Sequence, residues 1–241
     1  MNKKPIYKRI LLKMSGEALM GKSKFGIDSE VIEYIGKEIA DVLGLSVQVG
    51  VVIGGGNFFR GKTLFDAGLG RISGDNMGTI ATIINAIAMR DIFERNNVPA
   101  LIMSAIPMNG IVEHYDRRRA INKLEAGKVV IFAAGTGNPL VTTDSALSLR
   151  GIEIEADILL KATNVDGIYS ADPYKDPNAK RYKSLTYREV LNKELAIMDL
   201  AAFSQCRDYN MLLRVFNLHK AGALLKIVLG EDEGTIVSTG D

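Results

Sequence analysis

Two lysines stand at the ends of short apolar segments that are typical of buried strands. Lys13 closes the segment 7–13 and is followed by the turn sequence Ser15-Gly16, and Lys161 closes the segment 158–161. A buried ammonium group is costly unless it meets negative charge. A lysine beside a bare backbone turn is well placed to hold anionic oxygens. The two lysines therefore indicate a site for a phosphorylated ligand.

Two further apolar segments lead into glycine-rich turns that suit anions. Residues 47–53 run into Gly54-Gly55-Gly56-Asn57, with Arg60 close behind, and residues 129–133 run into GTGNPLVTTDSAL. Glycines let backbone N–H groups approach an anion without a Cβ clash, and the arginine fork matches phosphate. Two lysines and two anion turns together, without a cluster of metal ligands, favour phosphoryl transfer, which depends on positioning and charge neutralisation.

Two aspartates near expected helix starts each have two interpretations. Asp75, in SGDNMG, either caps a long helix or accepts hydrogen bonds from sugar hydroxyls, and Asp144 either caps the next helix or orients a catalytic lysine. The turn-rich segment after Lys161, VDGIYSADP, is suited to wrapping a base and ribose. Its Asp172-Pro173 pair is also ordinary turn chemistry.

Residues 16–23 spell GEALMGKS and match the Walker A pattern letter for letter. The context of a P-loop is missing, however. The four inner positions are good helix formers, and Gly26 interrupts the chain soon after Ser23, where a helix should begin. No clear apolar strand ends in an aspartate of Walker B type. We therefore interpret Lys22 as part of a lysine-rich surface turn.

Strand-like segments alternate with helical patterns, which predicts parallel β-α-β units and one sheet covered by helices on both faces. The expected strands are 7–13, 47–53, 99–104, 129–133, 158–161, 212–216 and 234–237. Helices are expected after the cap Asp28 or Ser29, from Gly74-Asp75, at 116–126 with Gly127 as its stop, at 145–150, after the capping box 186–189, and at 221–228. The long helix should face inward through Ile80, Ala81, Ile84, Ile87, Ala88 and Ile92. Because strand carboxyl ends meet at one edge of such a sheet, the lysines and glycine turns should converge there.

Composition limits the function classes. The chain has 241 residues, 47% of them hydrophobic and 24% charged, with a net charge of +2, which fits one folded domain and offers no general case for nucleic-acid binding. The single Cys206 fits a reducing compartment, and the longest apolar stretch is too short to span a bilayer. We expect a soluble cytoplasmic protein without a membrane partner. His114 and His219 are isolated and predict surface or structural roles, with no resident metal.

Long segments, in order, resemble the bacterial uridylate kinases (UMP kinases) of the amino acid kinase family rather than the P-loop nucleoside monophosphate kinases. They include KRILLKMSGEAL, VGVVIGGGNFFRG, SGDNMG, AAGTGNP, TTDSA, LLKATNVDGIYSADP, MDLAAF and RVFN. The resemblance implies a three-layer α/β/α sandwich with a mainly parallel sheet and transfer of a phosphoryl group from ATP to UMP in pyrimidine biosynthesis. Leu140-Val141 stand where the family commonly has aromatic residues, and Asn76 where it often has histidine.

The resemblance also implies roles for individual residues. Lys13 and Lys161 would neutralise the transferring phosphoryl group while Asp144 orients them. ATP would be held by Lys13, Met14, Ser15, Gly16, Gly56, Arg60, Thr163, Asn164, Tyr169 and Asp172. UMP would be held by Gly55, Asp75, Thr136, Gly137, Asn138, Pro139, Leu140, Val141, Thr142 and Thr143. The turn Gly21, Lys22, Ser23, Lys24, Phe25 and Gly26 would carry the response to GTP.

The same resemblance implies partners and organisation. The family is hexameric, activated by GTP and inhibited by UTP, and Mg²⁺ would arrive mainly on the ATP phosphates. Within one domain, 1–241, the N-terminal part would serve mainly UMP and the oligomer, and the C-terminal part mainly ATP. Two alternatives remain open. One is a carboxylate or carbamate kinase on the same fold, which the acceptor segment GTGNPLVTTD would discriminate. The other is a non-catalytic nucleotide sensor, against which the two strand-end lysines argue.

Overall fold

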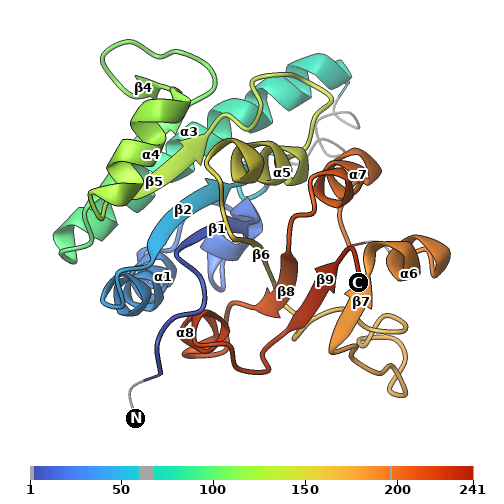
Figure 1. Cartoon of the computed structure of the whole chain (residues 1–241). Coiled ribbons are helices and arrows are strands. Elements are labelled where there is room, and N and C mark those ends of the chain that lie inside the picture. Colours follow the sequence, from blue (N-terminus) through green and yellow to red (C-terminus); the bar gives the residue numbers. More distant parts are fainter. Residues whose placement is uncertain (1–2, 60–67, 196, 241) are drawn as a thin grey trace.

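A mainly parallel sheet forms the centre of the molecule, as the alternation of segments predicts (Figure 1). The computed structural model describes residues 3–59, 68–195 and 197–240. Within these residues the strands lie in the order β4-β3-β5-β2-β1-β6-β8-β9-β7. All neighbouring pairs are parallel except β8 and β9. The strands are β1 (Arg9–Met14), β2 (Gln48–Ile53), β3 (Ala100–Ser104), β4 (Glu113–His114), β5 (Val129–Ala133), β6 (Ile158–Thr163), β7 (Ser184–Thr186), β8 (Leu213–Asn217) and β9 (Thr235–Ser238).

Helices cover both faces of the sheet, which confirms the three-layer α/β/α prediction (Figure 1). One layer contains α1 (Ser29–Leu43), α3 (Arg71–Arg95) and α8 (Ala223–Val228). The other contains α4 (Arg117–Glu125), α5 (Thr143–Glu153), α6 (Tyr187–Asn192) and α7 (Leu200–Asp208). Side chains alternate along the central strand β1, because Ile10 and Leu12 pack into the first core and Leu11 into the second.

Local signals set several helix ends as expected. The Asp28 carboxylate accepts a hydrogen bond from the Glu30 N–H and begins α1. Thr186 and Glu189 form the predicted capping box at α6. Gly127 follows α4 with a φ of 74°, the left-handed conformation that glycine adopts without strain.

The long helix α3 differs from its prediction in its start and in part of the face it buries. It begins at Arg71, so Asp75 lies inside the helix, and the cap residue is Gly70. Its buried side includes Thr82, Asn85 and Met89, whereas Ile80 is 50% and Ile84 41% exposed. The helix carries apolar residues around much of its circumference, and polar residues on the inner side bond to neighbouring loops. Ala81 and Ile92 are buried and Ile87 and Ala88 pack against the core, as predicted, so apolar periodicity was wrong only at Ile80 and Ile84.

The second correction concerns α5. The helix begins at Thr143, and the hydroxyl of Thr142 accepts from the N–H groups of Asp144 and Ser145. Of the two interpretations of Asp144, the one in which it caps this helix is therefore wrong, since Thr142 is the cap residue. Neither α7, in which Cys206 lies buried, nor the short 3₁₀ helix Gly16–Met20 was assigned from the sequence.

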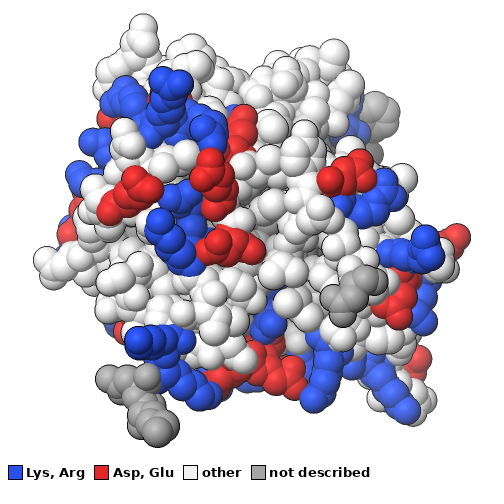
Figure 2. Space-filling model, in the orientation of Figure 1, with Lys and Arg blue, Asp and Glu red and all other residues white. Residues whose placement is uncertain are grey.

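Charge is mixed on the face that Figure 2 shows, where blue and red side chains lie interspersed around a broad uncharged centre. Many of the charged groups pair locally, as Arg119 does with Glu113 at 2.7 Å and Arg117 with Glu155. This face therefore does not present one continuous basic surface of the kind that holds a nucleic-acid backbone.

Candidate active site

The centre of the site is a pair of lysines joined by one carboxylate. Lys13 on β1 and Lys161 on β6 are direct partners in the register of the two strands. Asp144, in the first turn of α5, lies between them: Lys13 Nζ is 2.8 Å from Oδ1 and Lys161 Nζ is 2.6 Å from Oδ2. All three side chains are almost buried, with exposed fractions of 10 to 13%. Of the two interpretations of Asp144, the structure supports the one in which it orients lysines.

The surroundings of the triad favour the charge on Asp144 and weaken the charge on Lys161. Burial raises the pKa of the Asp144 carboxyl, but the ammonium groups of Lys13 and Lys161 outweigh burial and hold that pKa below its ordinary value. Burial lowers the pKa of Lys161, and the charge of Lys13 lowers it further, while Asp144 opposes both effects. The carboxylate is thus firmly ionised, and Lys161 holds its proton less tightly than an exposed lysine does.

Asp199, a carboxylate that the sequence analysis missed, connects the first turn of α5 to the start of α7. Asp199 caps α7 by accepting from the Ala202 N–H at 2.8 Å, and it also accepts from the hydroxyls of Thr142 and Ser145. Two residues before it, the Ile197 carbonyl accepts a hydrogen bond from Lys161. An aspartate directly before the run LAAF is a recognisable cap signal, and it was available in the sequence.

The lysines line a cavity of about 210 Å³ at the carboxyl ends of β1 and β6. The predicted ATP residues Ser15, Thr163 and Asn164 line it too, together with His219, which was not predicted there. Met14 does not reach this cavity, since its side chain is fully buried in the core.

Gly16 contributes through its lack of a side chain. A Cβ at this position would come within 2.5 Å of the Asn57 amide oxygen and 2.6 Å of the Gly56 nitrogen. Only glycine therefore lets the turn after β1 pack against the glycine-rich turn after β2.

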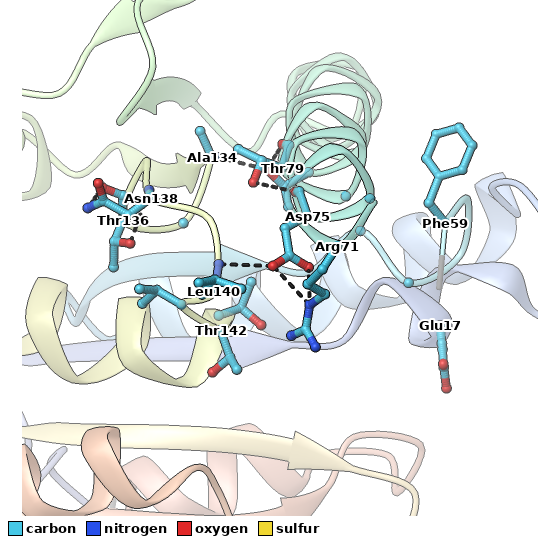
Figure 3. Close-up of a pocket in the computed structure, with 18 residues that line it drawn as sticks. Glu17, Phe59, Arg71, Asp75, Thr79, Ala134, Thr136, Asn138, Leu140 and Thr142 are labelled. Atoms are coloured by element: carbon cyan, nitrogen blue, oxygen red, sulfur yellow. Dashed lines mark hydrogen bonds and ion pairs between the residues drawn. The ribbon is translucent and has the colours of Figure 1, made fainter. Parts of the chain in front are cut away.

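A second cavity has a volume of about 450 Å³ (Figure 3). Most predicted UMP residues line it: Gly55, Asp75, Thr136, Asn138, Leu140, Val141, Thr142 and Thr143. Gly137 and Pro139 are not part of its lining. Gly56, expected on the ATP side, lines this cavity, and Arg60 lies outside the described residues.

Asp75 points across the second cavity to the opposite wall, as Figure 3 shows. Its Oδ2 accepts the Leu140 N–H at 2.9 Å, and its carboxylate also accepts from Arg71 Nε at 3.1 Å. The loop 136–143, which we call the acceptor loop, is thereby joined to α3. Lining residues that the sequence analysis missed are Glu17, Phe59, Arg71, Gly74, Gly78, Thr79, Thr82, Ala134 and Gly135.

A third cavity, of about 470 Å³, shares the lining residue Thr163 with the lysine cavity. It is lined by the predicted nucleoside residues Thr163, Tyr169 and Asp172, and by apolar side chains that include Ile168 and Val215. Thr163 belongs to this cavity and to the lysine cavity, so one extended ligand with phosphates at one end and a base at the other can occupy both.

Two buried asparagines hold the glycine-rich turn. Asn57 and Asn85 exchange hydrogen bonds of 2.8 Å through their side-chain amides, and Asn85 also donates to the Gly54 carbonyl at 2.7 Å. Asn57 donates in addition to the carbonyl of Gly26, in the turn that follows the Walker-like segment. The pair was not singled out from the sequence, because asparagines in a turn and a helix have no spacing that links them.

The Walker-like segment does not form a phosphate loop. Its inner residues form the 3₁₀ helix Gly16–Met20, and the next helix, α1, begins only at Ser29. Lys22 lines another cavity, of about 390 Å³, together with Asp28, Tyr34 and His219, and His219 also lines the lysine cavity. The turn 21–26 is therefore next to the glycine-rich turn, and Lys22 does not share the cavity of Lys13.

Within the described residues, no group of three or more histidine, cysteine, aspartate or glutamate side chains is arranged to hold a metal ion. The helices that the structure describes include none that is long and apolar enough to cross a membrane.

Two ammonium groups on a shared carboxylate are suited to neutralising the charge of a phosphoryl group. The model of the amino acid kinase family matches residues 8–217, and the chain belongs to this family. Among characterised relatives, it is 63% identical to the uridylate kinase of Coxiella burnetii over 98% of this chain and 97% of the relative. The chain is also 60% identical to the uridylate kinase of Pseudomonas aeruginosa, over 99% of this chain and 97% of the relative. The crystal structure of UMP kinase from Bacillus anthracis superimposes with a TM-score of 0.94, at 39% identity, and the match covers 98% of this chain and 97% of that one.

Proposed function

We propose that this protein transfers the γ-phosphoryl group of ATP to UMP, forming ADP and UDP. The observation that carries the proposal is the position of Asp144. The preceding residue, Thr143, lines the second cavity, which we call the acceptor cavity because most predicted UMP residues line it. The Asp144 carboxylate contacts both lysines of the lysine cavity, which we call the donor cavity. Relatives at 60 to 63% identity over almost their whole length are uridylate kinases, which supports the same acceptor here.

The chemistry follows from this arrangement. An oxygen of the UMP phosphate attacks the γ-phosphorus of ATP, and the bond from that phosphorus to the bridging oxygen of ADP breaks. Negative charge is spread over the γ-phosphoryl oxygens and the leaving oxygen during transfer. Lys13 and Lys161 neutralise this charge, and because Asp144 fixes both ammonium groups beforehand, little reorganisation is needed.

The two substrates approach from opposite sides of the triad. We propose that Asp75 accepts from the UMP sugar and that the segment 136–143 holds its phosphate and base, while Thr163, Tyr169 and Asp172 hold the ATP nucleoside. The N-terminal part of the chain thus serves mainly UMP and the C-terminal part mainly ATP. Both Asp144 oxygens already contact lysines, so Mg²⁺ is expected to arrive bound to the ATP phosphates.

The proposal extends to assembly and regulation. Ile80 and Ile84 form an exposed apolar stripe on α3 that supports self-association, for which we propose a hexamer. We propose GTP as an activator that acts through the turn 21–26, and UTP as an inhibitor. The buried thiol of Cys206 is compatible with the cytoplasm as the place of action.

A direct acceptor assay tests the proposal. The purified protein is incubated with ATP and Mg²⁺, and ADP release is measured with UMP, CMP, aspartate, glutamate or carbamate as the acceptor. Among these acceptors, we expect rapid ADP release only with UMP. Turnover of a carboxylate or carbamate without UMP turnover would establish the alternative kinase. Tight binding of UMP without ADP release would establish a sensor.

A further inference from the structure

His219 lies in a short turn that several hydrogen bonds hold in place at the end of β8. Its own N–H donates to the Asn217 side chain at 2.9 Å, and the neighbouring Leu218 N–H donates to the Thr163 carbonyl at 3.2 Å. From the other side, the Tyr34 hydroxyl donates to the Leu218 carbonyl at 3.0 Å. The imidazole is therefore carried on a fixed backbone, although the residue itself is exposed.

The His219 ring lines the lysine cavity and contacts a predicted ATP residue. Its Nε2 is 3.2 Å from Asn164 Oδ1, and both residues share the cavity wall with Lys13 and Lys161. Since the amide oxygen can only accept, a hydrogen bond at this distance requires the tautomer that carries its proton on Nε2. An N–H donor is thus already aimed along the wall of the cavity in which the phosphates are expected.

The cavity needs donors beyond the lysines. An ammonium group has three N–H donors, and Lys161 directs two of them to Asp144 and to the Ile197 carbonyl. Lys13 forms an ion pair with the same carboxylate, with 2.8 Å between Nζ and Oδ1. Asp144 also cancels one of the two positive charges. The phosphate oxygens of ATP outnumber the lysine donors that are left, so a further donor on the same wall has an evident use.

We propose that His219 is a binding residue for the phosphates of ATP and that Asn164 orients its imidazole. A phosphate oxygen that enters the cavity competes with the Asn164 carbonyl for the Nε2–H, and a charged acceptor forms the stronger hydrogen bond. The ring then turns from the amide to the phosphate. This inference rests on the proposed function, because it assumes ATP as the donor.

Kinetics of three variants test the inference. His219→Ala removes the donor, His219→Gln keeps an N–H donor on a side chain of similar reach, and His114→Ala is a matched control on the exposed strand β4. A hydrogen bond to a charged group predicts about a tenfold rise in the KM for ATP in His219→Ala. The KM for UMP and the Tm should stay unchanged. His219→Gln should restore most of the loss, and His114→Ala should match the wild type.

Inorganic tripolyphosphate, as a competitor of ATP, separates phosphate contacts from nucleoside contacts. Its inhibition constant should rise by the same factor as the KM for ATP in His219→Ala. An unchanged KM for ATP, or unchanged inhibition by tripolyphosphate, would overturn the inference. Failure of the wild type to phosphorylate UMP would instead refute the proposed function. Calorimetric binding of ATP to the same variants would then still decide the role of His219.

Discussion

Lys13 and Lys161 share one carboxylate, and this sharing makes each of the three residues depend on the others. Because an amide or alanine in place of either partner leaves a buried group without its counter-charge, single substitutions here disturb the whole triad. The lysine of the Walker-like segment, Lys22, takes no part in this arrangement and lines another cavity.

The first prediction compares these lysines. Lys13→Ala should reduce turnover to near background, since it removes a charge that faces the transferred group. Lys22→Ala should keep most of the basal turnover and alter only the response to GTP. Steady-state rates with and without GTP measure both effects. Loss of basal turnover in Lys22→Ala with a mild effect in Lys13→Ala would restore the P-loop interpretation.

The second prediction concerns alkaline pH. Burial and the Lys13 charge hold the pKa of Lys161 below its ordinary value of 10.5, so the ammonium group loses its proton at a lower pH than an exposed lysine. Turnover should therefore decline on the alkaline side before pH 10.5 is reached. In Lys161→Arg, the residual activity should decline only at higher pH, because guanidinium keeps its proton. The exposed Lys128→Arg serves as the control and should leave the pH profile unchanged.

The third prediction concerns backbone strain in the acceptor loop. Leu140 has a φ of 66° and is 63% exposed. The left-handed conformation costs a residue with a Cβ about 1–2 kcal/mol, so Leu140→Gly should raise the free energy of unfolding by up to about 1 kcal/mol. The neighbouring Val141 has no positive φ, and Val141→Gly should lower it by about 1 kcal/mol. Urea unfolding measures the free energy of unfolding of both variants. An equal loss of stability in Leu140→Gly and Val141→Gly would contradict backbone strain at Leu140.

At the scale of elements, the start of α5 and the start of α7 form one structural unit. Asp199 caps α7 and holds the hydroxyls of Thr142 and Ser145 at the first turn of α5, from which Asp144 reaches the lysines. Ser148 of α5 also donates to Gln205 of α7 at 2.6 Å. A residue that touches no reacting atom can therefore position the triad.

The fourth prediction tests this positioning role. Asp199→Ala should lower the free energy of unfolding by about 1–2 kcal/mol and also lower kcat, because the Asp144 turn loses its support. Asp116→Ala removes a comparable cap, which accepts from the Arg119 N–H at the start of α4. It should cost about 1 kcal/mol of stability with kcat unchanged. A similar kcat in both variants would show that Asp199 is only a cap.

At the scale of the whole molecule, α3 has two uses. Its inner side supplies Asn85 and Asp75 to the site, and its outer side exposes Ile80 and Ile84. Self-association through this outer side would place every acceptor cavity next to a subunit contact, because the same helix forms both.

The fifth prediction addresses that outer side. Ile84→Asp should reduce the particle mass in sedimentation or light scattering, since a buried isoleucine contributes about 2 kcal/mol and a buried charge opposes association. Tyr209→Asp changes another exposed apolar residue, at the end of α7, and should leave the mass unchanged. An unchanged mass for Ile84→Asp would place the contact elsewhere.

The sequence by itself determined which strand ends carry the chemically active residues. Lys13 and Lys161 lie near the carboxyl ends of buried strands and the glycine turn follows another, and parallel strands bring these ends to one edge whatever the details of packing. Helix caps such as Asp28 and Thr186 were equally predictable, because capping is a contact between residues close in sequence.

Only the tertiary structure decided which side chains meet across the chain. The choice between the two roles of Asp144 depended on the contacts of its carboxylate with Lys13 and Lys161. The buried side of α3 depended on Asn57 and Asn85 finding each other, and the place of His219 beside Asn164 depended on the register of β6 and β8. These contacts join residues between 17 and 131 positions apart. Local propensity and periodicity carry no information on such pairs, because their energies arise only once the sheet and its two helical layers have packed.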